Sequence, residues 1–357
     1  MIGEPKINYS EGTETIKNIG NRNVLCIIAP FKDSSFAFKA YPTIEQAVED
    51  QKTEITEALG YKYLQLLQKH FPTLKDIVLV NITTGTTTPD YALTNEKLSN
   101  AFEELEKTEV SIINIPYLLT SDQLEMYKTF RDEQFQNMFG FGLIYPTDPE
   151  TSSLTAVFNQ FKTGGIYAIA TTPQEIESEE YSIIDMSVYF AGLVASVDEN
   201  RSLTHYVLDG VVGETTKEKY GTSIYEAILN NGALATGYRD KVNNILQIVN
   251  SGTCTWNEKI KDTNDLKIDR VHHLIMNEIR RAIFNIIGKD NNRIASEDFN
   301  MAVSNIKEKY LKAGFITDLK TSINKTSSPK VEILMNDKQD NILTIVDVLG
   351  NIDIINT

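Results

Sequence analysis

The sequence predicts an α/β fold that becomes α+β over the whole chain, and three observations lead to this prediction. The run VLCIIAP at residues 24–30 is continuously apolar, as in a strand buried on both faces of a parallel sheet. Such runs alternate with amphipathic segments between about residues 20 and 185. From residue 186 onward, longer helical patterns replace this alternation. We therefore expect a mainly parallel sheet with flanking helices over 20–185 and an α+β domain over 186–349.

The first predicted domain alternates strands and helices. Residues 43–71 have helical spacing, with an N-cap at Thr43, and we expect a buried stripe of Ala47, Ile55, Leu59, Leu64 and Leu67. The apolar runs predict strands over 24–30, 76–82, 109–116, 141–146 and 165–172. The segments between them predict further helices over 95–108, 121–138 and 152–164. Right-handed crossovers would join these strands into one sheet.

The second predicted domain is richer in helix. After an apolar helical start at Met186, the patterns predict a strand at 206–212, a helix at 221–237, a strand or strand pair in 242–256 and a long helix at 265–292. Another helix is expected from Ser296 to Gly314, because acidic residues follow Ser296 and Lys312 precedes Gly314. The last strands, at 330–336 and 341–356, are separated only by DKQD and predict a hairpin.

Composition and charge limit the possible functions. The 357 residues are 41% hydrophobic and 23% charged, with a mean hydropathy of -0.24, as in a globular protein. A net charge of -15 argues against nucleic-acid binding, which needs a surplus of Lys and Arg. No signal peptide or membrane span is apparent, so we expect an intracellularly made protein. Cys26 and Cys254 lie in apolar or Thr-rich contexts that favour small buried side chains over a disulfide.

The search for catalytic or cofactor chemistry finds no constellation. The four histidines (His70, His205, His272 and His273) have no metal-binding spacing, and no phosphate-binding glycine motif follows a strand. The acidic run PQEIESEEY at 173–181 lacks the glycine turn of a calcium loop and predicts a solvated loop. We therefore expect no cofactor and no metal, while an enzyme with an unfamiliar mechanism stays open.

Both ends of the chain have strand patterns beyond the predicted domains. In the N-terminal arm, residues 1–19, Ile7 and Tyr9 alternate with Lys6 and Asn8. In the C-terminal arm, residues 350–357, an extended backbone places Ile352 and Ile354 on one side and Asp353 and Ile355 on the other. Strands donated to a neighbouring sheet gain main-chain hydrogen bonds. Donation in one direction between identical chains builds rings or helical filaments.

Several of these segments, in their order, resemble the contractile phage tail sheath proteins. The resemblance rests on AGLVASVDENRSLTHYVLDGV, EAILNNGALATG, ILQIVNSGTCTW and DRVHHLIMNEIRRAIFNIIGKDNN, followed by a Lys-bearing helix and terminal strands. It spans about residues 185–357, with a looser α/β match over 20–184. The length resembles the simpler sheaths of phages, R-type bacteriocins and similar particles.

The resemblance implies a structural function. It implies an outer α/β domain, an inner domain next to a tail tube, and a small sheet completed by arms of neighbouring subunits. The accepting strands would include Val331, Ile333, Ile345 and Val346, and the tube would face Lys307, Lys309 and Lys312. Implied partners are further copies of the chain, the tube protein, and baseplate and tail terminator proteins, without nucleic acid or membrane contact. The protein would be assembled in the bacterial host cytoplasm and belong to a virion tail or tail-like particle.

Two rival interpretations remain open at the level of sequence. The first is an α/β enzyme or nucleotide-binding protein whose terminal strands pair within its own chain. The second is a non-contractile filament or shell protein, which only the family resemblance disfavours. A catalytic cluster would favour the enzyme, and the sequence shows none.

Overall fold

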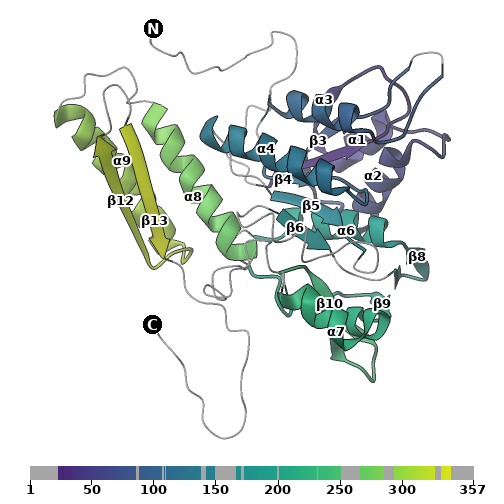
Figure 1. Cartoon of the computed structure of the whole chain (residues 1–357). Helices are drawn as coiled ribbons and strands as arrows, with labels where there is room; N and C mark the ends of the chain where they lie inside the picture. Colours follow the sequence, from purple (N-terminus) through teal and green to yellow (C-terminus); the bar gives the residue numbers. More distant parts are fainter. Residues whose placement is uncertain are drawn as a thin grey trace, which may run out of the picture.

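The computed structural model describes most of the chain: residues 23–85, 88–106, 108, 110–137, 142–148, 166–169, 173–198, 201–230, 232–250, 266–284, 293–325 and 331–338. A larger body contains the main sheet and its helices, and two long helices with a strand pair stand beside it (Figure 1). This mixed architecture confirms the predicted fold class.

A six-stranded sheet in the order β2-β3-β1-β4-β5-β6 forms the centre of the larger body. Five of its strands run parallel, and β2 alone pairs antiparallel, with β3. The strands are β1 (Leu25–Ala29), β2 (Phe38–Thr43), β3 (Lys75–Asn81), β4 (Ile112–Asn114), β5 (Gly142–Pro146) and β6 (Ile166–Ile169). The predicted parallel sheet is therefore confirmed. We did not predict β2, whose Pro42 is tolerated because this strand lies at the sheet edge.

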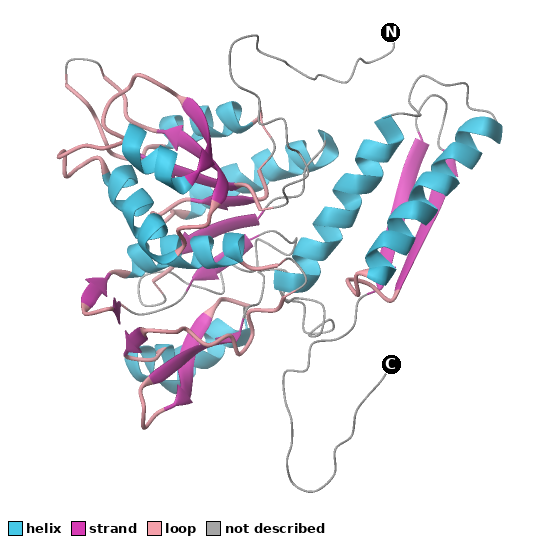
Figure 2. Ribbon diagram, turned by 180° about the vertical axis from the view of Figure 1, so that it is seen from behind, coloured by secondary structure: helices cyan, strands magenta, loops and turns pink. Residues whose placement is uncertain are grey.

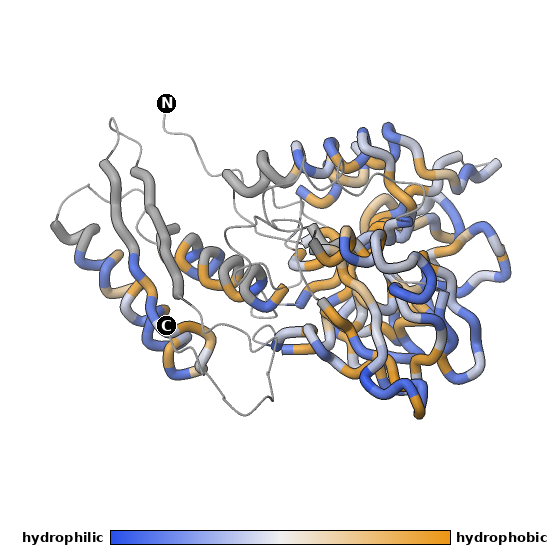
Figure 3. Tube along the Cα trace, turned by 60° about the horizontal axis from the view of Figure 1, so that its bottom comes forward, coloured by the Kyte–Doolittle hydropathy of each residue, from blue (hydrophilic) through white to orange (hydrophobic). Residues whose placement is uncertain are grey.

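Helices cover both faces of the sheet (Figure 2). In β1, Leu25, Ile27 and Ala29 belong to one core cluster, whereas Cys26 and Ile28 belong to the other, as the two-residue period of a strand requires. The first cluster contains residues of α1 (Ile44–Asp50), α2 (Leu59–His70) and α6 (Ile183–Ser196). The second contains residues of α3 (Asn95–Leu105), α4 (Ser121–Asn137) and α7 (Thr216–Asn230). Hydrophobic residues accordingly gather inside this body (Figure 3).

The helix predicted over 43–71 is two helices. Thr43 caps α1 as expected, since its side chain accepts a hydrogen bond from Gln46 N. The chain then leaves the helix, and Thr53 Oγ1 accepts a hydrogen bond from Ile55 N at 3.1 Å, which favours a turn. Ile55, predicted to be buried, is 40% exposed, so that part of the stripe was wrong.

The boundary predicted at residue 186 falls inside α6. This helix is apolar around most of its circumference, and its residues from Asp185 to Ala195 are all buried. It contacts α2, β4 and β5. A helix with no polar face needs cover on all sides, so it packs with the sheet rather than opening a new domain.

A smaller group of strands follows the main sheet. β8 (Glu179–Tyr181), β7 (Gln174–Ile176) and β9 (Val211–Gly213) form a three-stranded sheet, and β10 (Ala235–Asp240) pairs antiparallel with β11 (Ile245–Asn250). The acidic run predicted to be a loop is thus the β7–β8 hairpin. Glu177 and Ser178 adopt positive φ angles of 51° and 67° at its turn. This backbone conformation is typical of tight two-residue hairpins.

The last described part contains two long helices and a strand pair. They are α8 (Leu266–Phe284), α9 (Arg293–Lys312), β12 (Asp318–Lys325) and β13 (Val331–Lys338). The helix expected to start at Ser296 starts at Arg293, three residues earlier. Its end agrees with the prediction, because Gly314 has a φ of 71° and Phe315 N donates to Tyr310 O at 2.9 Å.

Candidate functional site: the C-terminal strand pair

The candidate assembly site is the antiparallel pair of β12 and β13. Their register runs without interruption from Asp318 opposite Lys338 to Lys325 opposite Val331. Among the residues that the structure describes, no third strand joins either edge of this pair. Open strand edges present unpaired backbone N–H and C=O groups, which can pair with another chain.

A separate hydrophobic core holds the strand pair against its two helices. Phe299, Val303, Ile306 and Tyr310 project from α9, while Ile316 and Leu319 come from the segment entering β12. Val271, Ile275 and Ile279 complete the cluster from α8. The spacing of three and four residues along both helices explains this shared apolar face. The strand pair therefore has its own support, independent of the main sheet.

The structure corrects the turn predicted after β13. We predicted that 330–336 would pair with 341–356 after a turn at 337–340, but Asp337 and Lys338 belong to β13 and pair with β12. The predicted partner strand, 341–356, lies outside the described residues. The missed strand β12 does carry a sequence signal, because Leu319, Thr321 and Ile323 alternate with polar residues. We missed this strand because the apolar pattern that follows it, toward the C-terminus, is stronger.

The structure places only part of the predicted assembly set. Val331 and Ile333 lie in β13, opposite Lys325 and Ile323. The other members fall outside the described residues: Lys6, Ile7, Asn8, Tyr9, Ile345, Val346, Ile352, Asp353, Ile354 and Ile355.

The three lysines predicted to face a tube form ion pairs with three different elements of the subunit. Lys307 binds Asp318 of the β12 start at 2.5 Å, and Lys309 binds Glu278 of α8 at 2.5 Å. These two ion pairs connect α9 to β12 and to α8. Lys312, 74% exposed, pairs only along its own helix, with Glu308 at 2.7 Å. Lys312 is the most exposed of the three, since the side chains of Lys307 and Lys309 are 37% and 48% exposed.

Side chains at and after the end of β3 bond the backbone that follows β1 at the carboxyl edge of the main sheet. Asn81, at the end of β3, accepts from Phe31 N at 3.1 Å and donates to the carbonyl oxygens of Asp33 and Phe36. Thr83 Oγ1 also accepts from Phe31 N, at 3.0 Å. The backbone amide that a phosphate would need after β1 is therefore already engaged.

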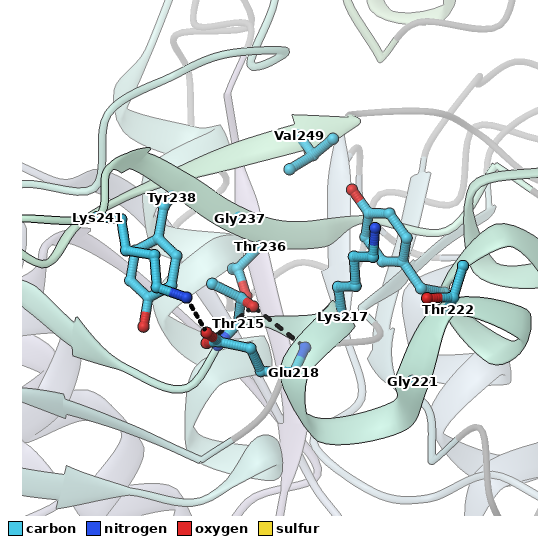
Figure 4. A pocket seen from close by; sticks show the side chains of 11 residues that line it. Thr215, Lys217, Glu218, Gly221, Thr222, Thr236, Gly237, Tyr238, Lys241 and Val249 are labelled. Carbon is cyan, nitrogen blue, oxygen red and sulfur yellow. Dashed lines mark hydrogen bonds and ion pairs between the residues drawn. The ribbon is translucent and has the colours of Figure 1, made fainter.

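A surface hollow of about 510 Å³ lies between α7, β10 and β11 (Figure 4). Its acidic group, Glu218, binds Lys241 at 3.0 Å and accepts a hydrogen bond from Thr215 N at 3.2 Å. The lysine and the amide lower the pKa of Glu218 to about 2. A carboxylate held so firmly in its ionised form is a poor general base at neutral pH.

Other candidate chemistry is limited in the described part of the chain. No group of three or more His, Cys, Asp or Glu residues there could hold a metal ion. Burial raises the pKa of the Cys26 thiol well above its usual range, consistent with the expected small core side chain. The helices described include none with the length and hydropathy needed to cross a membrane.

Comparison with known proteins gives a consistent result from structure alone. No protein-family model matches the sequence, and no curated protein matches it. The sheath tail protein of Listeria innocua matches with a TM-score of 0.65 at 11% identity, over 90% of this chain and 96% of the other. That of Desulfitobacterium hafniense matches with 0.62 at 12%, over 93% and 99%. A chain of the PVC sheath complex, an extracellular contractile injection system in its contracted state, matches with 0.64 at 12%, over 93% and 92%. The chain has the fold of these proteins.

Proposed function

We propose that the chain is the subunit of a contractile tail sheath, which polymerises around an inner tube and contracts to drive it through a target envelope. The observation that carries this proposal is the fold correspondence with sheath tail proteins over at least 90% of both chains. A correspondence of this extent leaves at most a tenth of this chain unmatched.

The strand pair gives the polymer a physical basis. The N-terminal and C-terminal arms of neighbouring subunits would add to the open edges of β12 and β13, with residues 341–349 contributing to the same sheet. If each arm formed about four to six backbone hydrogen bonds at about 0.5–1.5 kcal/mol each, it would contribute a few kcal/mol. Arms linked in this way act as hinges, so that subunits rotate as rigid bodies without losing their connections.

The partners follow from this assembly. They are further copies of the chain along the sheath, the tube protein inside it, and the baseplate and tail terminator proteins at its ends. We assign the tube contact to the exposed side of α9 around Lys312, and no longer to Lys307 and Lys309, whose ion pairs lie within the subunit. The particle would be a phage tail or tail-like particle assembled in the host cytoplasm.

The two rival functions have less support. An α/β enzyme would need a reactive group, whereas the Phe31 amide after β1 and the Glu218 carboxylate of the hollow are both bonded within the chain. A non-contractile filament or shell protein would share the open strand edges, but one of the structural relatives belongs to a sheath complex in the contracted state. Contraction is therefore the better-supported alternative.

Electron microscopy of the purified full-length chain tests the proposal. We expect long tubes with cogwheel-like cross-sections, alone or after mixing with the tube protein. Particles that stay monomeric at every protein and salt concentration, or that close into shells, would contradict it.

A further inference from the structure

The helix α8 belongs to two cores. Its first residue, Leu266, is 1% exposed and packs in the core cluster shared by α2, α6 and the main sheet. Five residues later, Val271 is fully buried in the core of the strand-pair unit, as is Ile275 after it. A single continuous helix therefore joins the body to the unit that carries β12 and β13.

Arg270 lies at the crossing point between these cores and is only 9% exposed. Its Nη2 donates to Asn23 Oδ1 at 2.7 Å and to Val197 O at 3.2 Å, and its Nη1 donates to Asp198 O at 3.5 Å. Asn23 Nδ2 also donates to Val197 O, at 3.3 Å. The guanidinium thus links α8, the end of α6 and Asn23, which lies two residues before β1.

The chemistry of these contacts explains why an arginine stands here. α6 ends at Ser196 with Val197 as its C-cap, so the carbonyl oxygens of its last turn need donors from outside the helix. A cation at this position also interacts favourably with the negative end of the helix dipole. The planar guanidinium can donate in several fixed directions at once, whereas a lysine ammonium is a flexible point charge. Contacts to two separate segments restrict both the tilt and the rotation of α8.

We propose that Arg270 is a positioning residue that fixes the direction of the strand pair relative to Asn23, the point where residues 1–22 join the body. In a polymer, the N-terminal arm of one subunit would start at Asn23 and pair with the β12–β13 sheet of a neighbour. The position of Asn23 relative to that sheet within each subunit would therefore set the rotation and translation from one subunit to the next. The link to lattice geometry rests on the proposed sheath function, whereas the fixed orientation within one subunit does not.

The orientation can be measured in the full-length monomer. Spin labels at Glu103→Cys on α3 and Ser304→Cys on α9, on a Cys254→Ser background, report the distance between the body and the strand-pair unit. We expect one narrow distance distribution for the parent and a clearly broadened or shifted one for Arg270→Lys and Arg270→Gln. Asn23→Ala, which removes one contact and keeps the arginine, should broaden it less. The matched control, Arg281→Lys, changes an exposed arginine on the same helix and should leave it unchanged.

A distance distribution as narrow in Arg270→Gln as in the parent would overturn the proposal. A broadened one in Arg281→Lys would overturn it too, since the effect would then not be specific to the crossing point. In assembled tubes, Arg270→Lys should give a variable helical twist where Arg281→Lys gives a uniform one, and a uniform twist in both would refute the role in the lattice. Failure of the parent itself to form tubes would refute the sheath function while leaving the monomer measurement valid.

Discussion

His70 lies among other ionisable groups at the edge of the body. Its Nε2 lies 3.2 Å from the Tyr181 hydroxyl, and its ring contacts Tyr189 edge-on at 5.5 Å between centroids. The charged groups facing it come from α2 and the β7–β8 hairpin, and they are Lys69, Glu177 and Glu179. Burial lowers the pKa of His70, with Lys69 adding to the effect.

This lowered pKa predicts a loss of stability in mild acid. The unfolded chain takes up a proton at His70 near pH 6.5, before the folded protein does. The free energy of unfolding should therefore fall as the pH drops below about 6.5, until the folded-state pKa is passed. Urea unfolding at about pH 7.5 and about pH 5.5 should show a smaller loss in His70→Gln than in the parent. His205→Gln, at an exposed histidine, is the control and should keep the full loss. An equal loss in all three proteins would refute the assignment to His70.

Among the helices and strands, local sequence signals explain most of the fold, and their failures have identifiable causes. The buried strands β1 and β3 were predictable because each is apolar on both faces. The break after α1 was not, because Thr53 and Ile55 fit a helical period while the Thr53 side chain favours a turn. β12 was missed because its alternation is weaker than the apolar run that follows it. The ion pairs of Lys307 and Lys309 could not be predicted from the sequence, because their partners lie on other elements, β12 and α8.

Charge reversal distinguishes Lys309, which pairs with α8, from Lys312, which pairs within its own helix α9. In Lys309→Glu, the new carboxylate would face Glu278 of α8, whose side chain is 19% exposed, so we expect the subunit to lose roughly 1 kcal/mol of unfolding free energy. In Lys312→Glu, only a pair exposed to 74% and 64% is lost, so stability should stay within about 0.5 kcal/mol of the parent. Urea unfolding measures both effects.

For assembly with the tube protein, we expect Lys312→Glu to have the larger effect, although it has the smaller effect on stability. Lys312→Glu should impair co-assembly at moderate salt although its subunit is stable, because it places a negative charge in the proposed contact. The double variant Glu278→Lys with Lys309→Glu should recover stability, since it restores an opposite-charge pair between α8 and α9. Normal co-assembly by Lys312→Glu would exclude this side of α9 as the tube contact.

Over the whole molecule, charge is distributed unevenly. Residues 266–338 contain 13 Lys and Arg and 9 Asp and Glu, which gives a net charge of +4. Because the whole chain has a net charge of -15, the remaining residues have a net charge of -19. Repeated in every subunit of a polymer, such a charge opposes close packing. Exposed ion pairs contribute little and are screened by salt. Donated strands are a better source of cohesion, because their main-chain hydrogen bonds depend little on charge.

Deleting residues 350–357 should therefore leave a folded, soluble subunit that does not form ordered sheath. The α8–α9 core packs against β12 through Leu319, and its members among the described residues all lie between 271 and 319. The lattice, by contrast, would lose a few kcal/mol at each contact, and each 1.4 kcal/mol or so lowers an association constant about tenfold. Deleting residues 1–10 should act in the same way, because that arm would complete the same shared sheet.

Thermal melting and sedimentation of the same truncated protein decide between donation and pairing within one chain. A donated strand predicts an unchanged melting temperature of the monomer together with loss of the large, fast-sedimenting species. A strand folded back on its own β12–β13 pair predicts the reverse, because removing it would uncover an edge and its apolar contacts within the subunit. A marked fall in monomer melting temperature, or tubes of normal length without the arm, would therefore refute strand donation by residues 350–357.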